Sequence, residues 1–348
     1  MEKNTRNSKL AFYARIGLVL HAFLLSLLIL YLGKVLFIPL FFALLVAILL
    51  YPLTRVLERK IKKNLASILP VLLFLVFIGS IIFFFTRELG LFLKDLPKAQ
   101  SKFEAIAQNV QSWVAEKFSV DDMQQIDYLK KSATGLISSA GTTFVSTIEF
   151  VVLFIFFLIF TYFILVHRRL LTNFILAFFE QEHKSKVNTV INSTRSMINN
   201  YVLGLLTEMA IMFSLILIIL FLLGVKYAML IAVIAAVLNI IPYLGIYIAA
   251  AFGMLIAVTN GTGNLAIYTG ISFIIVHFVD ANILMPHIVG GRVKINPFIT
   301  IVAVIMGKLI WGIPGMFLFI PLTAIIRIIS ENVQDLKPWS ILIGEEKD

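Results

Sequence analysis

Acidic side chains inside long apolar stretches are the residues of this chain best suited to do chemistry. Three qualify: Glu149, Glu208 and Asp280. A charged side chain at the centre of a membrane helix costs about 2.5–3.5 kcal/mol on insertion scales, so such residues usually mark ion or solute sites, or pair with other buried groups. Because Glu149 is close to the end of its apolar stretch, its carboxylate can reach water at the membrane surface. Glu208 and Asp280 are therefore the stronger candidates.

Asp280 has the most suggestive neighbours in the sequence. His277 precedes it by three residues, so an imidazole and a carboxylate can share one helix face. Asn282 adds an amide, and Pro286 is expected to end the helix and leave its last carbonyl groups unpaired. Carboxylate, amide and carbonyl oxygens together suit Na⁺ or a proton. The alternative is that Asp280 and Asn282 cap broken backbone between helices or subunits.

Glu208 follows Asn200 and Gly204 at intervals of four residues, a spacing that predicts a shared helix face. The glycine would allow another helix to approach closely and would leave Glu208 facing a cavity. We expect Glu208 either to act in transport or gating, or to pair structurally with Lys308 or another buried base.

Proline and glycine interrupt the apolar stretches in the last third of the chain. Bilayer hydrocarbon offers the backbone no water, so broken helices persist there only against protein or a wet cavity. Transporters use such breaks to build binding sites. Asn239 at the first break is accordingly a further binding candidate, and a simple kink or tight turn is the alternative interpretation there. The hinge or broken-helix candidates are Pro242, Gly245, Pro286, Gly290, Pro297, Gly312, Pro314, Gly315 and Pro321.

Composition indicates a membrane protein that crosses the bilayer many times. Hydrophobic residues make up 60% of the 348 and charged residues 14%, whereas soluble domains have about half and a quarter. The net charge of +10 comes largely from short basic blocks between apolar stretches, which is typical of cytoplasmic loops and not of a nucleic-acid surface. Without cysteine, disulfides, thiolate zinc sites and thiol nucleophiles are excluded. Because phosphate-loop, zinc-protease and hydrolase motifs are missing too, we expect no metal, no cofactor and no enzymatic activity.

The apolar stretches must position the candidate residues. A spanning helix needs about 20 apolar residues, which predicts an all-α fold with about eight membrane segments, some of them Pro/Gly-broken helical hairpins. The expected segments are 16–32, 35–51, 65–86, 143–166, 201–223, the broken 228–259, 264–285, and a hairpin of 298–311 and 316–329.

Charge distribution predicts the orientation of these segments. Residues 1–15, 54–64 and 167–200 are net basic, whereas 87–142 has no net charge. The positive-inside rule then places both termini in the cytoplasm and 87–142 outside, where its helical periodicity predicts an amphipathic extracytoplasmic segment. We therefore divide the chain into membrane helices 1–86, extracytoplasmic segment 87–142, a fourth helix with a cytoplasmic linker 143–200, a broken-helix transport region 201–330 and a cytoplasmic tail 331–348.

Three stretches of the last third resemble the AI-2E family, the autoinducer-2 exporter-like permeases of bacteria and archaea. They are Leu223-Gly224 followed by Asn239-Ile-Ile-Pro242-Tyr-Leu-Gly245; Asp280-Ala-Asn282-Ile-Leu-Met-Pro286-His-Ile-Val-Gly290; and Val293-Lys-Ile-Asn-Pro297 with Gly307, Gly312, Gly315 and Pro321. The family usually has Glu where Asp280 stands. The resemblance implies a multi-pass protein of the bacterial inner membrane, a homo-oligomer (pentamers are associated with the family) and elevator-like movement. It also implies export of small polar molecules such as autoinducer-2, while other members are linked to Na⁺(Li⁺)/H⁺ antiport.

Three functions follow as hypotheses. The leading one is a secondary transporter or exporter of a small polar solute, coupled to an ion gradient because no ATP-binding motif is present. The second is a Na⁺(Li⁺)/H⁺ antiporter without an organic solute. The third is a non-transporting membrane scaffold that binds a partner through residues 87–142. The expected partners are the lipid bilayer, the solute, and Na⁺ or H⁺.

Overall fold

The computed structural model describes residues 12–118, 147–240, 245–260, 263–285, 287–288 and 295–345. These residues are almost entirely helical, and the only extended pairing among them is an isolated bridge between Ile295 and Gly344. The elements are α1 (Phe12–Leu32), α2 (Lys34–Leu57), α3 (Lys63–Phe118), α5 (Thr147–Ala177), α6 (Gln181–Leu222), α7 (Ala228–Leu238), α8 (Gly245–Asn260), α9 (Gly263–Val279), the π-helix η2 (Asp280–Leu284), α11 (Pro297–Trp311), α12 (Ile313–Asn332), the 3₁₀ turn η4 (Gln334–Leu336) and α13 (Lys337–Ile343).

The all-α, polytopic prediction is confirmed. Six helical stretches are long and apolar enough to cross a membrane: all or most of α2, α3, α5, α6 and α12, and α9 continued by η2. Four shorter apolar stretches, in α1, α7, α8 and α11, accompany them. Large apolar side chains stay exposed along the spans, as at Phe221 (75%) and Leu222 (78%). A surface of this kind suits contact with lipid.

Several helices extend beyond the ends expected from hydropathy. The span expected at 65–86 continues without a break as α3 to Phe118, so the first part of the expected extracytoplasmic segment belongs to the same helix; residues 119–142 lie outside the described residues. The basic linker is likewise continuous with the next span, because α6 has 42 residues and is about 63 Å long. Hydropathy indicates where a helix leaves the hydrocarbon, but Gln, Glu, Lys and Arg are good helix formers and do not end it.

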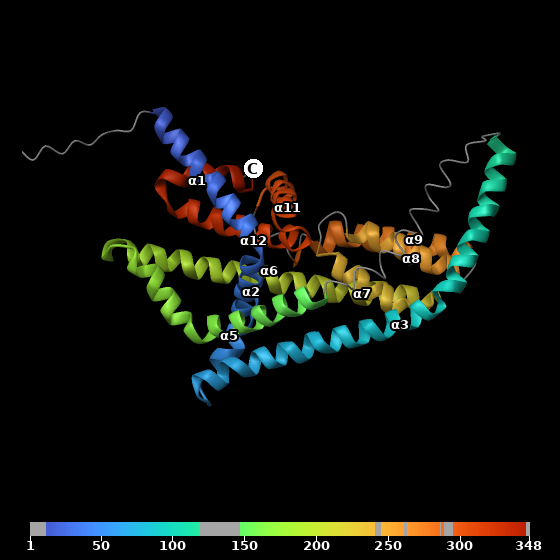
Figure 1. Cartoon of the computed structure of the whole chain (residues 1–348), viewed down its shortest axis with the longest axis horizontal. Coiled ribbons are helices and arrows are strands. Elements are labelled where there is room, and N and C mark those ends of the chain that lie inside the picture. The colour runs from blue at the N-terminus through green and yellow to red at the C-terminus, as the bar shows by residue number, and fades with distance from the viewer. Residues whose placement is uncertain are drawn as a thin grey trace, which may run out of the picture.

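Two hydrophobic cores lie along α6. The first surrounds the C-terminal half of α6 and joins it to α7, α8 and α9, with Phe92 contributed by α3. The second surrounds residues 197–202 of α6 and joins them to α2, α11, α12 and α13. In Figure 1, α7–α9 lie together near one end of the molecule, and α1, α11 and α12 lie on the other side of its centre. The long helix α6 therefore contacts both groups.

The hairpin of α11 and α12 is packed backbone to backbone. It turns at Gly312, which has a positive φ of 66°. An added Cβ at Gly307 would lie 2.2 Å from the carbonyl oxygen of Gly315, and one at Gly315 would lie 2.0 Å from that of Gly307. Trp311 then anchors the hairpin to α1, since its indole N–H donates to the carbonyl oxygen of Leu30 at 2.8 Å.

The proline positions of this hairpin differ from simple helix breaks. Pro297 opens α11 next to Asn296, whose side chain accepts a hydrogen bond from the Phe298 N–H at 2.7 Å. Pro314 lies in the first turn of α12, so α12 begins at Ile313 and not after Gly315. A first-turn proline is compatible with a helix because its missing N–H has no partner to lose there. Helix α12 also continues through Pro321.

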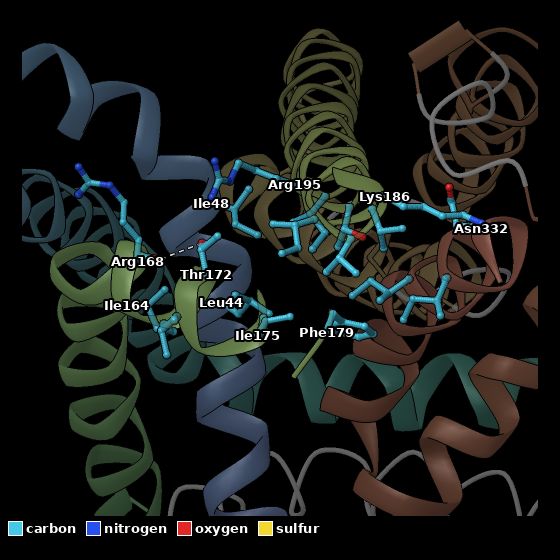
Figure 2. Close-up of a pocket in the computed structure, with 18 of the residues that line it drawn as sticks. Leu44, Ile48, Ile164, Arg168, Thr172, Ile175, Phe179, Lys186, Arg195 and Asn332 are labelled. Atoms are coloured by element: carbon cyan, nitrogen blue, oxygen red, sulfur yellow. Dashed lines mark hydrogen bonds between the residues drawn. The ribbon is translucent and has the colours of Figure 1, made fainter. Parts of the chain in front are cut away.

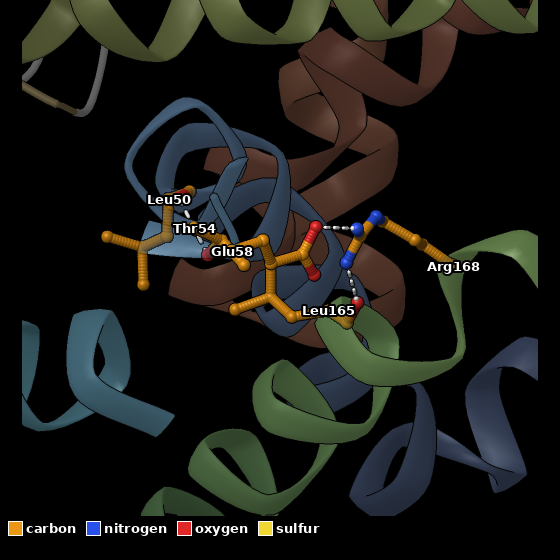
Figure 3. A network of polar contacts seen from close by, with 5 residues as sticks. All are labelled: Leu50, Thr54, Glu58, Leu165 and Arg168. Atoms are coloured by element: carbon orange, nitrogen blue, oxygen red, sulfur yellow. Dashed lines mark hydrogen bonds and ion pairs between the residues drawn. The ribbon is translucent and has the colours of Figure 1, made fainter. Parts of the chain in front are cut away.

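A polar clamp joins α2 to α5 (Figure 3). The Arg168 guanidinium forms an ion pair with Glu58 and donates a second bond, of 2.7 Å, to the carbonyl oxygen of Leu165. Beside this clamp lies a cavity of about 640 Å³ between α2, α5, α6 and α12 (Figure 2). Both features are at the basic ends of the apolar stretches of α2 and α5.

Candidate functional site

Glu208 lies in the middle of α6 and is buried, with 6% of its surface exposed. Tyr201, Gly204 and Met212 are buried on the same helix, at spacings of seven, four and four residues from Glu208. The expected face with Asn200 is wrong, because Asn200 is exposed. Two intervals of four rotate the helix by about 80°, whereas an interval of seven rotates it by only about 20°. Tyr201, not Asn200, therefore shares the face of Glu208.

Asn239 brings a second element to Glu208. It follows the last residue of α7, and its side-chain amide donates to Glu208 Oε1 at 3.0 Å. Helix α7 can place the amide there because it packs along α6 through buried small and aliphatic residues such as Ala232 and Ala235. The alternative pairing of Glu208 with Lys308 is not observed, since Lys308 is exposed on α11. Asn239 is instead the polar partner of Glu208.

Asp280 is the third member of the cluster. It is 6% exposed and begins the π-helical segment η2 that continues α9. Its carboxyl group interacts with both Glu208 and Asn239, while the Asn239 amide donates its hydrogen bond to Glu208. Single-turn π segments are rare and occur frequently at functional sites. Two neighbouring carboxylates repel each other when both are ionised, and a bound proton or cation would relieve this repulsion.

His277 completes the cluster one turn before Asp280. Its ring meets that of Tyr247 edge to face, with 5.5 Å between the ring centres. Among the described residues, neither His277 Nδ1 nor Asp280 Oδ1 has a hydrogen-bond partner, although both atoms are buried. Buried polar atoms are satisfied in the great majority of cases. These two atoms could therefore still accept or donate a hydrogen bond.

The remaining binding candidate, Asn282, is not part of the cluster. Its side chain is exposed and donates to the carbonyl oxygen of Phe278 on its own helix, at 2.8 Å. Asn282 is only two residues from Asp280, and near-helical geometry turns such neighbours to different faces. Glu208, Asn239, His277 and Asp280 thus come together, whereas Asn282 does not.

The break between α7 and α8 depends on Gly245. An added Cβ would lie 1.7 Å from the carbonyl oxygen of Leu238, which only glycine tolerates. This contact brings the start of α8 against the end of α7, directly beside Asn239. The candidate hinges Pro242, Pro286 and Gly290 lie outside the described residues, and the side chain of Glu149 is not described.

The cluster suits binding and release of small charged or polar species. Among the described residues, no group of three or more His, Cys, Asp or Glu side chains is placed to hold a metal ion. What the four residues offer is two carboxylates, one amide and one imidazole from three elements of the first core. Sequence reasoning missed Tyr247, which orients His277, and the π geometry at Asp280. The edge-to-face ring contact depends on α8 folding back onto α9, and no residue spacing signals it.

The chain is similar to known proteins along nearly its whole length. Residues 20–335 match the family model described as AI-2E family transporter. YueF of Bacillus subtilis is 24% identical over 316 residues, which cover 84% of each chain. YhhT of Escherichia coli K12 is 28% identical over 123 residues, and YrrI of B. subtilis is 30% identical over 105 residues. These two matches span about a third of each relative's length, 35% and 30%. All three relatives are named as candidate transport proteins.

Proposed function

Since the chain belongs to the AI-2E transporter family and is a multi-pass membrane transport protein, we propose that it moves a small polar solute through the cluster of Glu208, Asn239, His277 and Asp280. In this proposal the two carboxylates bind a proton or Na⁺, and the solute binds against the amide and the imidazole. The movement is ion-coupled and in the direction of export, with a solute similar to autoinducer-2.

The observation that carries the proposal is the convergence of Glu208 and Asp280 beside buried atoms that have no hydrogen-bond partner among the described residues. The two residues are 72 positions apart in the sequence and come from different helices, yet Asp280 interacts with both Glu208 and its partner Asn239. Keeping two acids together in an apolar core costs stability unless something is bound. In a site that alternately binds and releases a cation or proton, this repulsion favours binding of the next ion. A purely structural contact would only lose stability by it.

The arrangement of the helices supports elevator-like movement. Helices α7–α9 and the hairpin α11–α12 both pack on α6 and belong to different cores, so one group has an interface along which to slide. The family resemblance and the basic segments support placement in the bacterial inner membrane with both termini in the cytoplasm. The resemblance also supports a homo-oligomer, specifically a pentamer.

Na⁺(Li⁺)/H⁺ antiport is the second candidate function. It is favoured by the acidic character of the cluster, because two carboxylates and an amide oxygen are hard ligands that suit Na⁺ or H⁺ without any organic solute. In that case the unpaired Asp280 Oδ1 would be a ligand to the ion.

Transport by the full-length protein in proteoliposomes tests the proposal. Efflux of labelled autoinducer-2 and movement of protons under a Na⁺ gradient would be measured for the wild type, Glu208→Gln and Asp280→Asn. We expect each variant to retain less than about a tenth of the wild-type flux. Glu182→Gln is the matched control, because Glu182 is an exposed carboxylate on the same helix as Glu208.

Each outcome of this experiment has a distinct meaning. Loss of both activities in the two variants supports ion-coupled solute transport. Na⁺-dependent proton movement without autoinducer-2 efflux, abolished by Asp280→Asn, would instead favour the antiporter. Wild-type flux in both variants would remove the cluster from the mechanism.

A further inference from the structure

The cavity between α2, α5, α6 and α12 is separate from the acidic cluster. It has a volume of about 640 Å³, within the range of small-molecule sites. Arg195, one of its lining residues, lies 13 positions before Glu208 on α6, which is roughly 20 Å along the helix axis. Its occupant therefore does not depend on the proposed function of the acidic cluster.

Most of the cavity wall is aliphatic or aromatic. Leu44 and Ile48 come from α2, Ile175 and Phe179 from α5 and its end, Ile191 from α6 and Ile329 from α12. A small polar metabolite would gain little from such a wall, whereas a hydrocarbon chain would gain from every apolar contact. The wall therefore selects for an acyl chain.

One edge of the cavity is basic. Figure 2 shows the side chains of Arg168, Arg195 and Lys186 along this edge, with Leu44, Ile175 and Phe179 on the opposite side. Arg195 lies over the ring of Tyr51, with 5.0 Å to the ring centre, and Arg168 lies over the same ring at 5.4 Å. The ring thus holds both guanidinium groups at the mouth.

The positive charge of this edge is only partly compensated. Glu58 pairs with Arg168, but within the described residues no ion pair involves Arg195 or Lys186, and no acidic residue lines the cavity. His183 adds an imidazole ring to the lining. The mouth thus offers an anion at least two unneutralised cations.

The cavity also lies at the depth of a lipid headgroup. The apolar parts of α2 and α5 end just before Arg55 and Arg168, and that of α6 begins at Tyr201, six positions after Arg195. A molecule that places its anionic group among these arginines would leave its chain on the apolar side. Basic pockets between membrane helices at this level recognise acidic lipid headgroups.

We propose that this cavity binds an acidic phospholipid of the surrounding bilayer, with its phosphate at Arg195, the rest of its headgroup along the basic edge toward Lys186, and an acyl chain between α2, α5 and α12. The lipid joins α5 to the α6–α12 core at a place where the protein alone leaves a void.

Binding of dioleoylphosphatidylglycerol to the purified full-length protein tests this site. Bound lipid would be counted by native mass spectrometry during a titration in neutral detergent, with dioleoylphosphatidylcholine in parallel. We expect dioleoylphosphatidylglycerol to bind at least tenfold more tightly than dioleoylphosphatidylcholine. Arg195→Gln should raise the Kd of dioleoylphosphatidylglycerol roughly tenfold, as expected for loss of a hydrogen bond between charged groups. Arg169→Gln is the matched control, because Arg169 is an exposed arginine outside the cavity. The Kd of this variant for dioleoylphosphatidylglycerol should change less than twofold.

Two further variants keep the test decisive. Lys186→Gln changes an exposed side chain and cannot prevent folding, so it replaces Arg195→Gln if that variant does not fold. Val190→Trp fills the cavity wall and should abolish binding of one lipid per chain without changing charge. Equal binding of the two lipids, or wild-type binding by both Lys186→Gln and Val190→Trp, would overturn the proposal. If oleate bound as tightly as dioleoylphosphatidylglycerol, the cavity would be assigned to a free fatty acid. If the variants changed the oligomeric state without loss of bound lipid, the cavity would be assigned to a second copy of the chain.

Discussion

Replacing Gly307 by alanine tests the packing of the α11–α12 hairpin most directly. The new Cβ would be placed 2.2 Å from the carbonyl oxygen of Gly315 and 3.0 Å from the amide nitrogen of Met316. Real Cβ atoms essentially never approach another heavy atom within 3.0 Å. Because the opposing atoms belong to the backbone, no side chain can rotate away, and the two helices must separate locally by almost 1 Å.

The energetic cost follows from what that separation breaks. Trp311 and Met316 are buried in the same contact, and overpacking of a tight core costs about 1–3 kcal/mol. Alanine offsets part of this cost, since it is favoured over glycine in a helix by about 0.8–1 kcal/mol. We expect a net destabilisation of about 1–2 kcal/mol, and a lower unfolding temperature by about 2–4 °C for each kcal/mol.

Thermal unfolding in detergent, followed by tryptophan fluorescence, measures this effect, because Trp311 is buried at the hairpin turn. Gly79→Ala on α3 is the matched control, since no atom lies within 4 Å of its added Cβ. That variant keeps only the helix-propensity gain and should be neutral or slightly stabilised. If Gly307→Ala were as stable as Gly79→Ala, the close helix approach, and with it the geometry of the hairpin, would be refuted.

Three other changes give sharp expectations. Glu58→Gln leaves the partly buried arginine of the α2–α5 clamp without its counter-ion and should lower the unfolding free energy by about 3 kcal/mol. Glu331→Gln removes the more exposed ion pair within α12 and should lower it by less than about 0.5 kcal/mol. Equal losses in chemical unfolding would contradict a stabilising role of the clamp. The hydrogen bond from Lys226 to Asp95 raises the pKa of the ammonium above its usual 10.5. The unfolding free energy that the wild type has in excess of Lys226→Met should therefore be constant between about pH 7 and 10 and disappear as the pH rises through the raised pKa. An excess that grows with pH would contradict this reasoning. Trp311→Phe removes the hydrogen bond to α1 and should lower the unfolding free energy by about 1 kcal/mol, and an unchanged unfolding temperature would show that the indole N–H contributes nothing.

The apolar membrane helices were accessible from the sequence because hydrocarbon imposes a simple rule. Every backbone group in lipid must be satisfied within its own segment, so long apolar stretches have to be helices. The ends of helices were not accessible in the same way. Residues 87–118 and 181–200 are polar enough to leave the membrane, yet they continue α3 and α6, since nothing in their composition stops a helix.

The candidate site was predictable in its members more than in its geometry. The cost of a buried charge singled out Glu208 and Asp280, and their local spacing brought His277 into consideration. The hydrogen bond from Asn239 to Glu208 could not be anticipated, because it depends on how α7 packs along α6. Nor could the sequence show that Asn282 and Lys308 are both exposed in the folded chain.

The sequence by itself therefore determined the class of protein, the apolar spans and the acidic residues that are expensive to bury, because each of these follows from the free energy of transferring single residues or short segments to an apolar phase. Only the tertiary structure decided that Asp280 meets Glu208 and Asn239, that Asp280 begins a π-helical turn, and that Arg168, Lys186 and Arg195 line one edge of an apolar cavity. Such pairings depend on the register and crossing of helices that are distant in the sequence, and no local transfer energy contains that information.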